Sequence, residues 1–211
     1  MLGTRPDIAF VVIKMLQFSS NPMEEDLQKV LYIMRYLSSF QDLCILYFEH
    51  GDQNGLCAYS NTDWAGDIET SYSTTGYTIF LGNSIVSWLS RRQWQVTLSS
   101  TEAEYCEMTK VAKQLCWICN IYKELWFKIG QLSLCVDNQG AIFLASNPAQ
   151  EGWTKHVHMT NHYIHESVEF GEIKLYYMPT HQQFTDIFTK NLDKQKFENE
   201  KKSFQLSPFR L

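Results

Sequence analysis

The chain has 211 residues, of which 45% are hydrophobic and 14% aromatic, enough apolar material for a packed core, and this excludes global disorder. Its formal net charge of −5 excludes a whole-chain positive field, so a nucleic-acid partner would need a local basic patch or metal ions. The longest apolar stretches, 8–13 and 30–34, are much shorter than the roughly 20 residues of a membrane span, and no signal peptide is evident. We therefore expect an intracellular protein, cytoplasmic or nuclear, with no membrane partner.

Periodic apolar residues predict helices within residues 5–50. The first follows Pro6 and has apolar positions from Ile8 to Leu16. The second follows Pro22, starts with three acidic residues, and continues with a periodic apolar face up to Leu37. This region is expected to be an N-terminal helical extension.

The hydrophobic period then changes from helical to alternating. Three strands are predicted, at 56–60, 74–81 and 85–89, and the last two are joined by a Gly-Asn turn at 82–83. Neighbouring strands with such short links indicate an antiparallel meander.

The second half of the chain alternates between helical and strand patterns. A capping sequence at 99–102 opens a helix that runs to about Phe127. After it come a strand at 132–136, helices at 139–145 and 159–170, a strand at 173–178 and a helix at 184–192. This order predicts an α/β fold in which helices pack against a mixed sheet. Residues 193–211 are polar and charged, and we expect them to form a loose tail.

Four polar residues lie at the ends of these predicted elements. Asp137 follows a strand, Glu104 lies in the first turns of the long helix, Asp186 begins the last helix, and Asn61 follows the first strand. Ligands of open sheets bind at strand ends. Two carboxylates about 4 Å apart would repel by roughly 4 kcal/mol at an effective dielectric constant of about 20, so such a cluster would require cations, and Mg²⁺ prefers oxygen ligands. Spacing alone leaves a helix-capping or surface role open for each acid.

Several short sequences, in order and at specific spacing, resemble the ribonuclease H domain of copia-type retrotransposon polyproteins. They are AYSNTDWAGD (58–67), STTGY (73–77), IVSW (85–88), LSSTEAEY (98–105), VDNQGA (136–141), TKH (154–156) and TDIFTK (185–190). Upstream, TRPDI (4–8) and RYL (35–37) resemble the segment that joins the preceding reverse transcriptase to this domain. The chain thus resembles the carboxyl-terminal piece of a longer polyprotein.

The resemblance implies a ribonuclease H-like fold, a five-stranded mixed sheet flanked by helices. It also implies cleavage of the RNA strand of an RNA–DNA hybrid with two Mg²⁺ or Mn²⁺ ions. Aligned on the motifs, the catalytic and metal-binding acids are Glu104, Asp137 and Asp186. The acid of the first strand falls on Asn61.

Asn61 departs from the family pattern. The family has Ser-Asp-Ala-Asp-Trp where this chain has Ser-Asn-Thr-Asp-Trp at 60–64. An amide oxygen can coordinate a cation but carries no charge. Asp63 would point to the same face of a regular strand but about 6.6 Å further along, so it is a weaker candidate metal ligand. We therefore expect weak or absent catalysis.

Other residues of the motifs are candidates for contact with substrate. His181, five residues before Asp186, could act on the leaving group or in product release. Lys155 and His156 could meet phosphate, and Asn138 and Gln139 could contact nucleic acid.

These observations divide the chain into a helical remnant of the reverse transcriptase connection (1–54), a ribonuclease H-like domain (55–192) and a polar tail (193–211). The expected partners are an RNA–DNA hybrid and the reverse transcriptase portion of the polyprotein. Two alternatives stay open. One is a non-catalytic nucleic-acid-binding remnant or domesticated module, and the other is an expressed fragment without a selected role.

Overall fold

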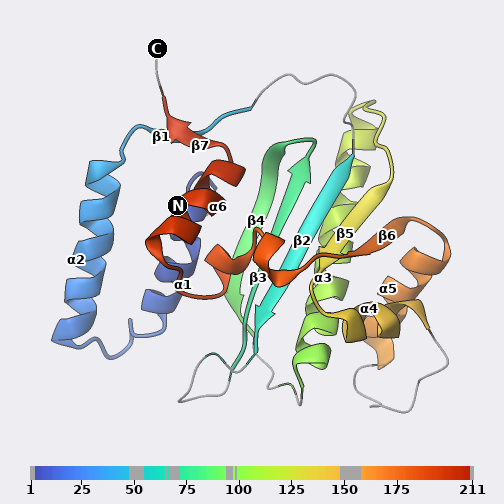
Figure 1. Ribbon diagram of the computed structural model, residues 1–211, viewed down its shortest axis with the longest axis horizontal. Coiled ribbons are helices and arrows are strands. Elements are labelled where there is room, and N and C mark those ends of the chain that lie inside the picture. The colour runs from blue at the N-terminus through green and yellow to red at the C-terminus, as the bar shows by residue number, and fades with distance from the viewer. Residues whose placement is uncertain are drawn as a thin grey trace.

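The computed structural model describes residues 3–47, 55–64, 66, 72–93, 97, 99–147 and 158–209, and Figure 1 shows its helices and strands. The first half contains η1 (Pro6–Ile8), α1 (Ala9–Leu16), α2 (Glu24–Ser39), β1 (Leu43–Ile45), β2 (Leu56–Asp63), β3 (Thr74–Leu81) and β4 (Ser84–Arg92). The second half contains α3 (Ser100–Glu124), β5 (Leu132–Val136), α4 (Gln139–Ser146), α5 (His158–Glu169), β6 (Ile173–Tyr177), η3 (Thr180–Gln182), η4 (Asp186–Phe188), α6 (Lys194–Ser203) and β7 (Leu206–Pro208).

The centre of the molecule is a five-stranded mixed sheet with the strand order β4-β3-β2-β5-β6. The β2–β3 and β3–β4 pairs are antiparallel, whereas β2–β5 and β5–β6 are parallel. The predicted α/β fold, a five-stranded mixed sheet with flanking helices, is confirmed.

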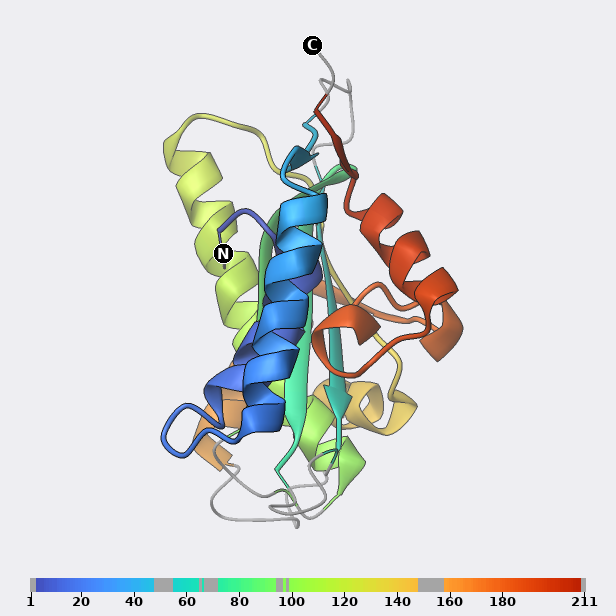
Figure 2. The ribbon, with the colours of Figure 1, turned by 90° about the vertical axis from the view of Figure 1, so that its left-hand side faces the viewer.

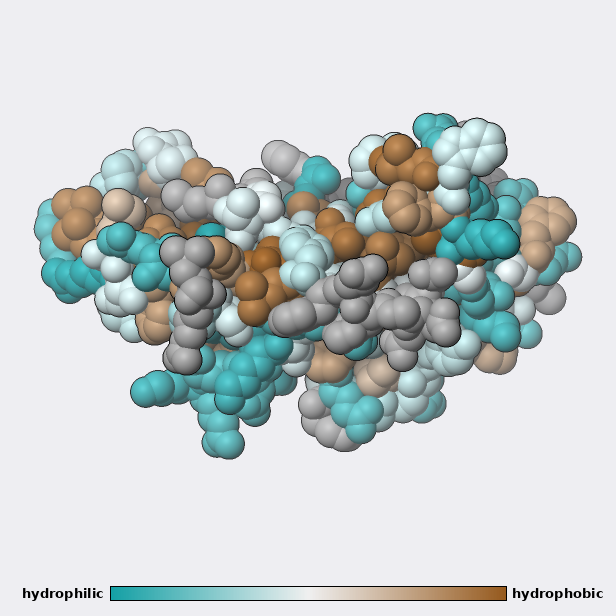
Figure 3. All heavy atoms as spheres, turned by 90° about the horizontal axis from the view of Figure 1, so that it is seen from above, coloured by the Kyte–Doolittle hydropathy of each residue, from teal (hydrophilic) through white to brown (hydrophobic). Residues whose placement is uncertain are grey.

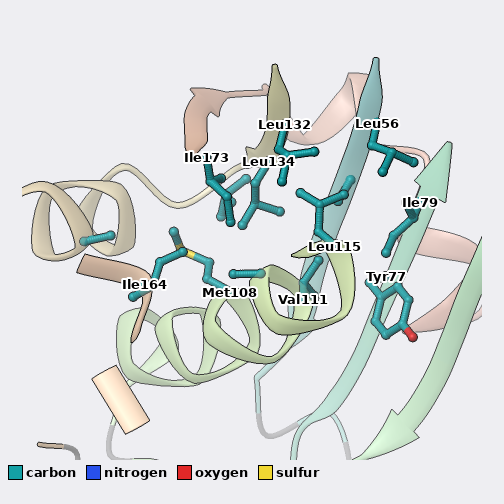
Figure 4. Packing of buried hydrophobic residues seen from close by; sticks show 14 of the residues in the cluster. Leu56, Tyr77, Ile79, Met108, Val111, Leu115, Leu132, Leu134, Ile164 and Ile173 are labelled. Carbon is teal, nitrogen blue, oxygen red and sulfur yellow. The ribbon is translucent and has the colours of Figure 1, made fainter. Parts of the chain in front are cut away.

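The long helix α3 packs against one face of this sheet (Figure 4). Its fully buried residues Met108, Val111 and Leu115 recur every three or four positions, which places them on one side of the helix. They meet Ile79 from β3 and Leu134 from β5, both also without exposed surface. This packing fixes the start of α3, where Glu104 lies, against the sheet.

A second apolar cluster lies on the opposite face. Side chains alternate along a strand, so β3 sends Ile79 to the first cluster and Phe80 to the second. The second cluster joins Ala9 from α1, Leu43 from β1 and Phe204 from the end of α6. Segments from both ends of the described chain therefore cover one face of the sheet, and β1 pairs with β7 in a separate antiparallel ribbon.

The structure corrects two predictions near the C-terminus. Instead of a helix at 184–192, it has only the short 3₁₀ helix η4. The expectation of a loose tail is wrong for residues 194–208, which form α6 and β7. Asp193 caps α6 by accepting a 2.9 Å hydrogen bond from the N–H of Lys196, and Phe204 is fully buried. The prediction failed because α6 is anchored by isolated aromatic residues rather than by a periodic apolar stripe.

Helix α2 lies at the outside of the molecule, in front of the rest in Figure 2. It contacts α1, which lies against β4. Its residues Leu27, Val30, Leu31 and Met34 are all exposed, and hydrophobic atoms appear on the surface at that end in Figure 3. Across the described ranges, no helix combines the length and apolarity that crossing a membrane would require.

Candidate active site

The candidate site begins at the carboxyl end of β2. The sequence predicted that this strand ends at Ser60, but it extends to Asp63, so Asn61 is part of the sheet rather than of the following loop. Asn61 pairs with Gly76 of β3 in antiparallel register. Near this pair, η4 lies against the face of the sheet opposite α3.

Gly76 allows η4 to approach the sheet. A Cβ atom at this position would lie 2.5 Å from Cβ of Phe188 and 3.1 Å from Cγ2 of Thr189. No side chain fits there, so the glycine of the STTGY sequence is required by close packing. The same packing places Asp186, the first residue of η4, beside Asn61.

Asn61 and Asp186 are in direct contact. Nδ2 of Asn61 lies 2.5 Å from Oδ1 of Asp186 and donates a hydrogen bond to it. Asn61 is 6% exposed and Asp186 is fully buried. The amide therefore acts towards the carboxylate as a neutral donor.

Two lysine side chains complete the surroundings of Asp186. Nζ of Lys190 lies 2.9 Å from Oδ1, and Nζ of Lys196 forms an ion pair with Oδ2. Both carboxylate oxygens thus hold an ammonium group, and both lysines remain partly exposed. The site has two positive charges around one buried negative charge.

Glu104 has one partner and one unused oxygen. Its Oε1 accepts a 2.5 Å hydrogen bond from the backbone N–H of Thr62. Its Oε2 is buried and has no hydrogen-bond partner among the described residues. Burial raises the pKa of Glu104 well above its ordinary value, and the negative charge of Asp137 raises it further. A buried acceptor without a donor is suited to a cation.

Asp137 follows directly after β5, the strand parallel to β2. Its Oδ2 accepts a 2.9 Å hydrogen bond from the hydroxyl of Thr180, which lies in η3. The sequence analysis did not identify Thr180, because its position beside Asp137 depends on how the chain returns after β6. Asp137 and Glu104 form the acidic part of the site.

Asp63 is partly buried, and its side chain packs against the backbone of Gly66. Burial raises its pKa, the charges of Lys190 and Lys14 lower it, and that of Asp186 raises it. Asp63 therefore shares the electrostatic environment of Asp186, but within the described residues no hydrogen bond joins the two.

The site residues fall into two groups that Asn61 and Thr62 connect. Asn61 contacts Asp186, and its neighbour Thr62 contacts Glu104. In the part of the chain that the structure describes, no three His, Cys, Asp or Glu side chains are grouped closely enough to hold a metal ion. The unpartnered Oε2 of Glu104 fits a hard cation near Asp137, whereas the oxygens of Asp186 already hold lysines.

The remaining candidates are only partly described. Lys155 and His156 lie outside the described residues, and so does the side chain of His181. Asn138 caps α4 by accepting a 3.0 Å hydrogen bond from the N–H of Ala141. Gln139, the next residue, is exposed.

Lys196 is the residue that the sequence analysis missed most clearly. It lies beyond the last motif, in the segment that was expected to be a loose tail. The capping residue Asp193, followed by a helix-favouring run, was the available signal for α6. Its contact with a residue ten positions earlier could not be inferred from that signal.

No family model matches the chain, but similar proteins exist. It is 37% identical over 197 residues to the retrovirus-related Pol polyprotein from transposon RE1 of Arabidopsis thaliana, which covers 93% of the chain and 13% of that protein. It is 34% identical over 198 residues to the corresponding polyprotein from transposon TNT 1-94 of Nicotiana tabacum, covering 94% of the chain and 15% of that protein. A third relative, secreted RxLR effector protein 161 of Plasmopara viticola, is 39% identical over 118 residues, 56% of the chain and 82% of that protein.

Solved structures with a similar arrangement include LC11-RNase H1 in complex with an RNA/DNA hybrid, with a TM-score of 0.47 and 9% identity over 64% of this chain and 93% of that one. Another is the N-terminal RNase H domain of Rv2228c from Mycobacterium tuberculosis, with a TM-score of 0.47 and 8% identity. The match covers 71% of this chain and 97% of that one. The identity to the transposon polyproteins extends over nearly the whole chain, which spans only about a seventh of their length. The chain belongs to the family of retrovirus-related Pol polyproteins of copia-type transposons, and the part of it that resembles the ribonuclease H domain of that family forms the five-stranded mixed sheet.

Proposed function

We propose that this domain binds RNA–DNA hybrids and hydrolyses the RNA strand weakly, with Glu104, Asp137 and Asp186 as its acids. The observation that carries the proposal is the buried Oε2 of Glu104, which has no partner in the described structure and lies in the field of Asp137. A buried acceptor in this state is costly unless a cation or donor occupies it.

The residues of the site would divide the work. Glu104 and Asp137 would hold Mg²⁺ or Mn²⁺, which supplies charge stabilisation and a more acidic bound water when present. The N–H of Thr62 orients Glu104, and the hydroxyl of Thr180 orients Asp137. Both contacts fix a carboxylate before any ligand arrives, which reduces the cost of binding.

Asn61 accounts for weak activity. Its N–H group is directed at Asp186, so this position contributes a donor and no negative charge. Two divalent ions close together need several carboxylates to offset their repulsion. With Asn61 neutral and Asp186 paired with lysines, a second ion would be bound poorly. Each loss of about 1.4 kcal/mol of transition-state stabilisation lowers the rate about tenfold.

The motif residues that the structure leaves untested belong to the same proposal. Lys155 and His156 would meet backbone phosphates, Gln139 is exposed for contact with nucleic acid, and His181 would act near the scissile phosphate. Asn138 already caps α4, so its role would be to fix the start of that helix.

Residues 1–54 would be the remnant of the reverse transcriptase connection, and the ribonuclease H-like unit would extend beyond residue 192, because residues 194–208 form α6 and β7 and Phe204 packs in one cluster with Phe80 of the sheet. The exposed apolar side of α2 would contact the reverse transcriptase portion of the polyprotein. Leu27, Met34 and their apolar neighbours on this helix are available for that contact.

A cleavage assay on a labelled RNA–DNA hybrid tests the main proposal. With Mg²⁺ or Mn²⁺, the natural chain should release RNA fragments with 3′-hydroxyl ends slowly, and Glu104→Gln should release none. Equal product from both proteins would contradict the proposed role of Glu104.

A second candidate function is binding of nucleic acid without cleavage. It is favoured by Asn61 and by the two lysines around Asp186, which give a net positive charge at that point. Hybrid binding that persists in EDTA, combined with no cleavage in either metal, would support this function over the first.

A further inference from the structure

The carboxylate of Asp186 is enclosed by the protein's own cations. We propose that Lys196 is a built-in counter-ion at Asp186, which takes the place of a divalent ion there and confines metal binding to Glu104 and Asp137. This inference rests on the proposed function, because it assigns the ion of that function to one half of the site.

Burial is the first step of the argument. The Asp186 side chain has no exposed surface, and Lys190 and Lys196 both lie between it and solvent, being 39% and 33% exposed. Three donors, from Asn61, Lys190 and Lys196, occupy its two oxygens. A divalent ion can reach this carboxylate only by displacing at least one ammonium group.

Charge is the second step. The two ammonium groups exceed the charge of Asp186 by one unit, and Asn61 adds none. The negative charge of nearby Asp63 is also offset, because Lys190 and Lys14 both interact favourably with it. A divalent ion would therefore enter a site whose negative charge is already balanced, and it would be repelled by the remaining lysine.

The third step is that Lys196 is held in place by the fold. Its backbone N–H is fixed by the capping carboxylate of Asp193 at 2.9 Å. One turn further along α6, Oε2 of Glu200 accepts a 2.9 Å hydrogen bond from the N–H of Ile187, the residue after Asp186. The first bond fixes the start of α6, and the second joins α6 to η4 one turn beyond the ion pair.

Lys196 also lines a polar groove of about 360 Å³, together with Gln183, Asn199 and Glu200 among others. Lys196 therefore contacts Asp186 and also lines an accessible surface. Lys190 belongs to the TDIFTK sequence, whereas Lys196 lies beyond all the motifs, so the counter-ion is supplied by α6.

Titration with Mn²⁺ alone tests the proposal, because the magnetic resonance signal of the free ion counts the ions that each full-length chain binds. Over the range of Mn²⁺ concentrations in which Lys196→Gln binds two ions, the natural chain should bind one. The affinity of Lys196→Gln for the second ion should be at least tenfold higher than that of the natural chain. Lys196→Arg keeps the charge and should behave as the natural chain does. Lys194→Gln removes the same charge from an exposed position on the same helix and should leave the ion count at one.

An unchanged second-ion affinity in Lys196→Gln, with circular dichroism showing a folded protein, would overturn the proposal. So would an equal gain in Lys194→Gln, because the effect would then be one of overall charge. If Lys196→Gln does not fold, Lys190→Gln removes the other ammonium group and should give a similar gain, and its failure to do so overturns the proposal equally.

Failure of the proposed function would look different. If Glu104→Gln binds as many ions as the natural chain, or if no variant binds hybrid, the assignment of the first ion or of the substrate is wrong. The comparison of Lys196→Gln with Lys194→Gln still reports on Asp186 in either case.

Discussion

The side-chain amide of Asn61 donates a 2.5 Å hydrogen bond to Oδ1 of Asp186, across 125 positions of sequence. The resemblance to ribonuclease H domains implies an acid at position 61, which would face Asp186 as a second negative charge. Here the amide and two ammonium groups satisfy the carboxylate instead. All the observed partners of Asp186 are therefore groups of the protein itself.

Asn61→Asp should lower the free energy of unfolding in EDTA by roughly 1–3 kcal/mol, because a hydrogen-bond donor to a buried carboxylate is replaced by a like charge. Mg²⁺ should then raise the melting temperature of the variant more than that of the natural chain, since an added carboxylate strengthens ion binding to the folded state. Hybrid cleavage should increase as well. Thermal unfolding with and without Mg²⁺ measures the first two effects.

Asn83→Asp is the matched control for this substitution. It makes the same chemical change at an exposed position in the turn between β3 and β4. Its stability and its response to Mg²⁺ should stay close to those of the natural chain. If both variants respond equally to Mg²⁺, the effect is not specific to the site.

Glu104→Gln should stabilise the metal-free protein by about 1–2 kcal/mol, because a neutral amide is cheaper to bury than a carboxylate whose second oxygen has no partner in the described structure. Oε1 of the new side chain can still accept from the N–H of Thr62. The variant should also lose the response of its melting temperature to Mg²⁺.

Glu102→Gln tests which of the two glutamates in the LSSTEAEY sequence (98–105) holds the ion. Glu102 lies in the first turn of α3 and is more exposed than Glu104. Its replacement should cost no more than roughly 0.5 kcal/mol of favourable interaction with the helix N-terminus and should leave the Mg²⁺ response intact. If the melting temperature of Glu102→Gln no longer responds to Mg²⁺, the assignment of the ion to Glu104 is wrong.

Glu200 should make the stability depend on pH. Burial raises the pKa of this carboxyl to about 7, and the charge of Asp186 adds to the rise, whereas the N–H of Ile187 and the charges of Lys196 and Lys190 oppose it. The folded-state pKa is thus above that of the unfolded chain. The associated stability is fully present below about pH 4.5 and is lost as pH rises towards 7.

Glu200→Gln should therefore remove part of the decline in stability between about pH 4.5 and 7, and the variant should be the more stable protein at pH 8. Urea unfolding at a series of pH values measures this difference. Parallel curves for the two proteins would show that Glu200 has an ordinary pKa in the folded state.

The sheet could be predicted from the sequence because its signals are local. The limits of β3 and β5 coincide with the predicted ones. β3 is rich in β-branched and aromatic residues and ends at the Gly-Asn turn at 82–83, and β5 is a short, mostly apolar run between Gly130 and Asp137. The acids of the site could be named from short motifs. Asp186 was correctly placed at the start of an element, although that element is a short 3₁₀ helix rather than a longer α-helix.

The contacts that give the site its character depend on long-range packing. Two such contacts are the approach of η4 to Gly76 and the ion pair between Lys196 and Asp186. The local sequence around each residue does not predict its partner. α6 was missed for the same reason, because its stability comes from the burial of Phe204 against Phe188 and Phe80 rather than from a periodic stripe.

Phe204→Ala should lower the free energy of unfolding by about 3–5 kcal/mol, the usual cost of removing a buried aromatic side chain. The ring of Phe204 is fully buried, and its centroid lies 5.5 Å from that of Phe188 and 6.3 Å from that of Phe80. Phe209→Ala makes the same change five residues later, where the side chain is 59% exposed, and should cost less than about 1 kcal/mol. Because α6 carries Lys196, Phe204→Ala should also increase Mn²⁺ binding at Asp186, and Phe209→Ala should not. Equal unfolding midpoints in urea for the two variants would show that the C-terminal segment is not part of the folded core.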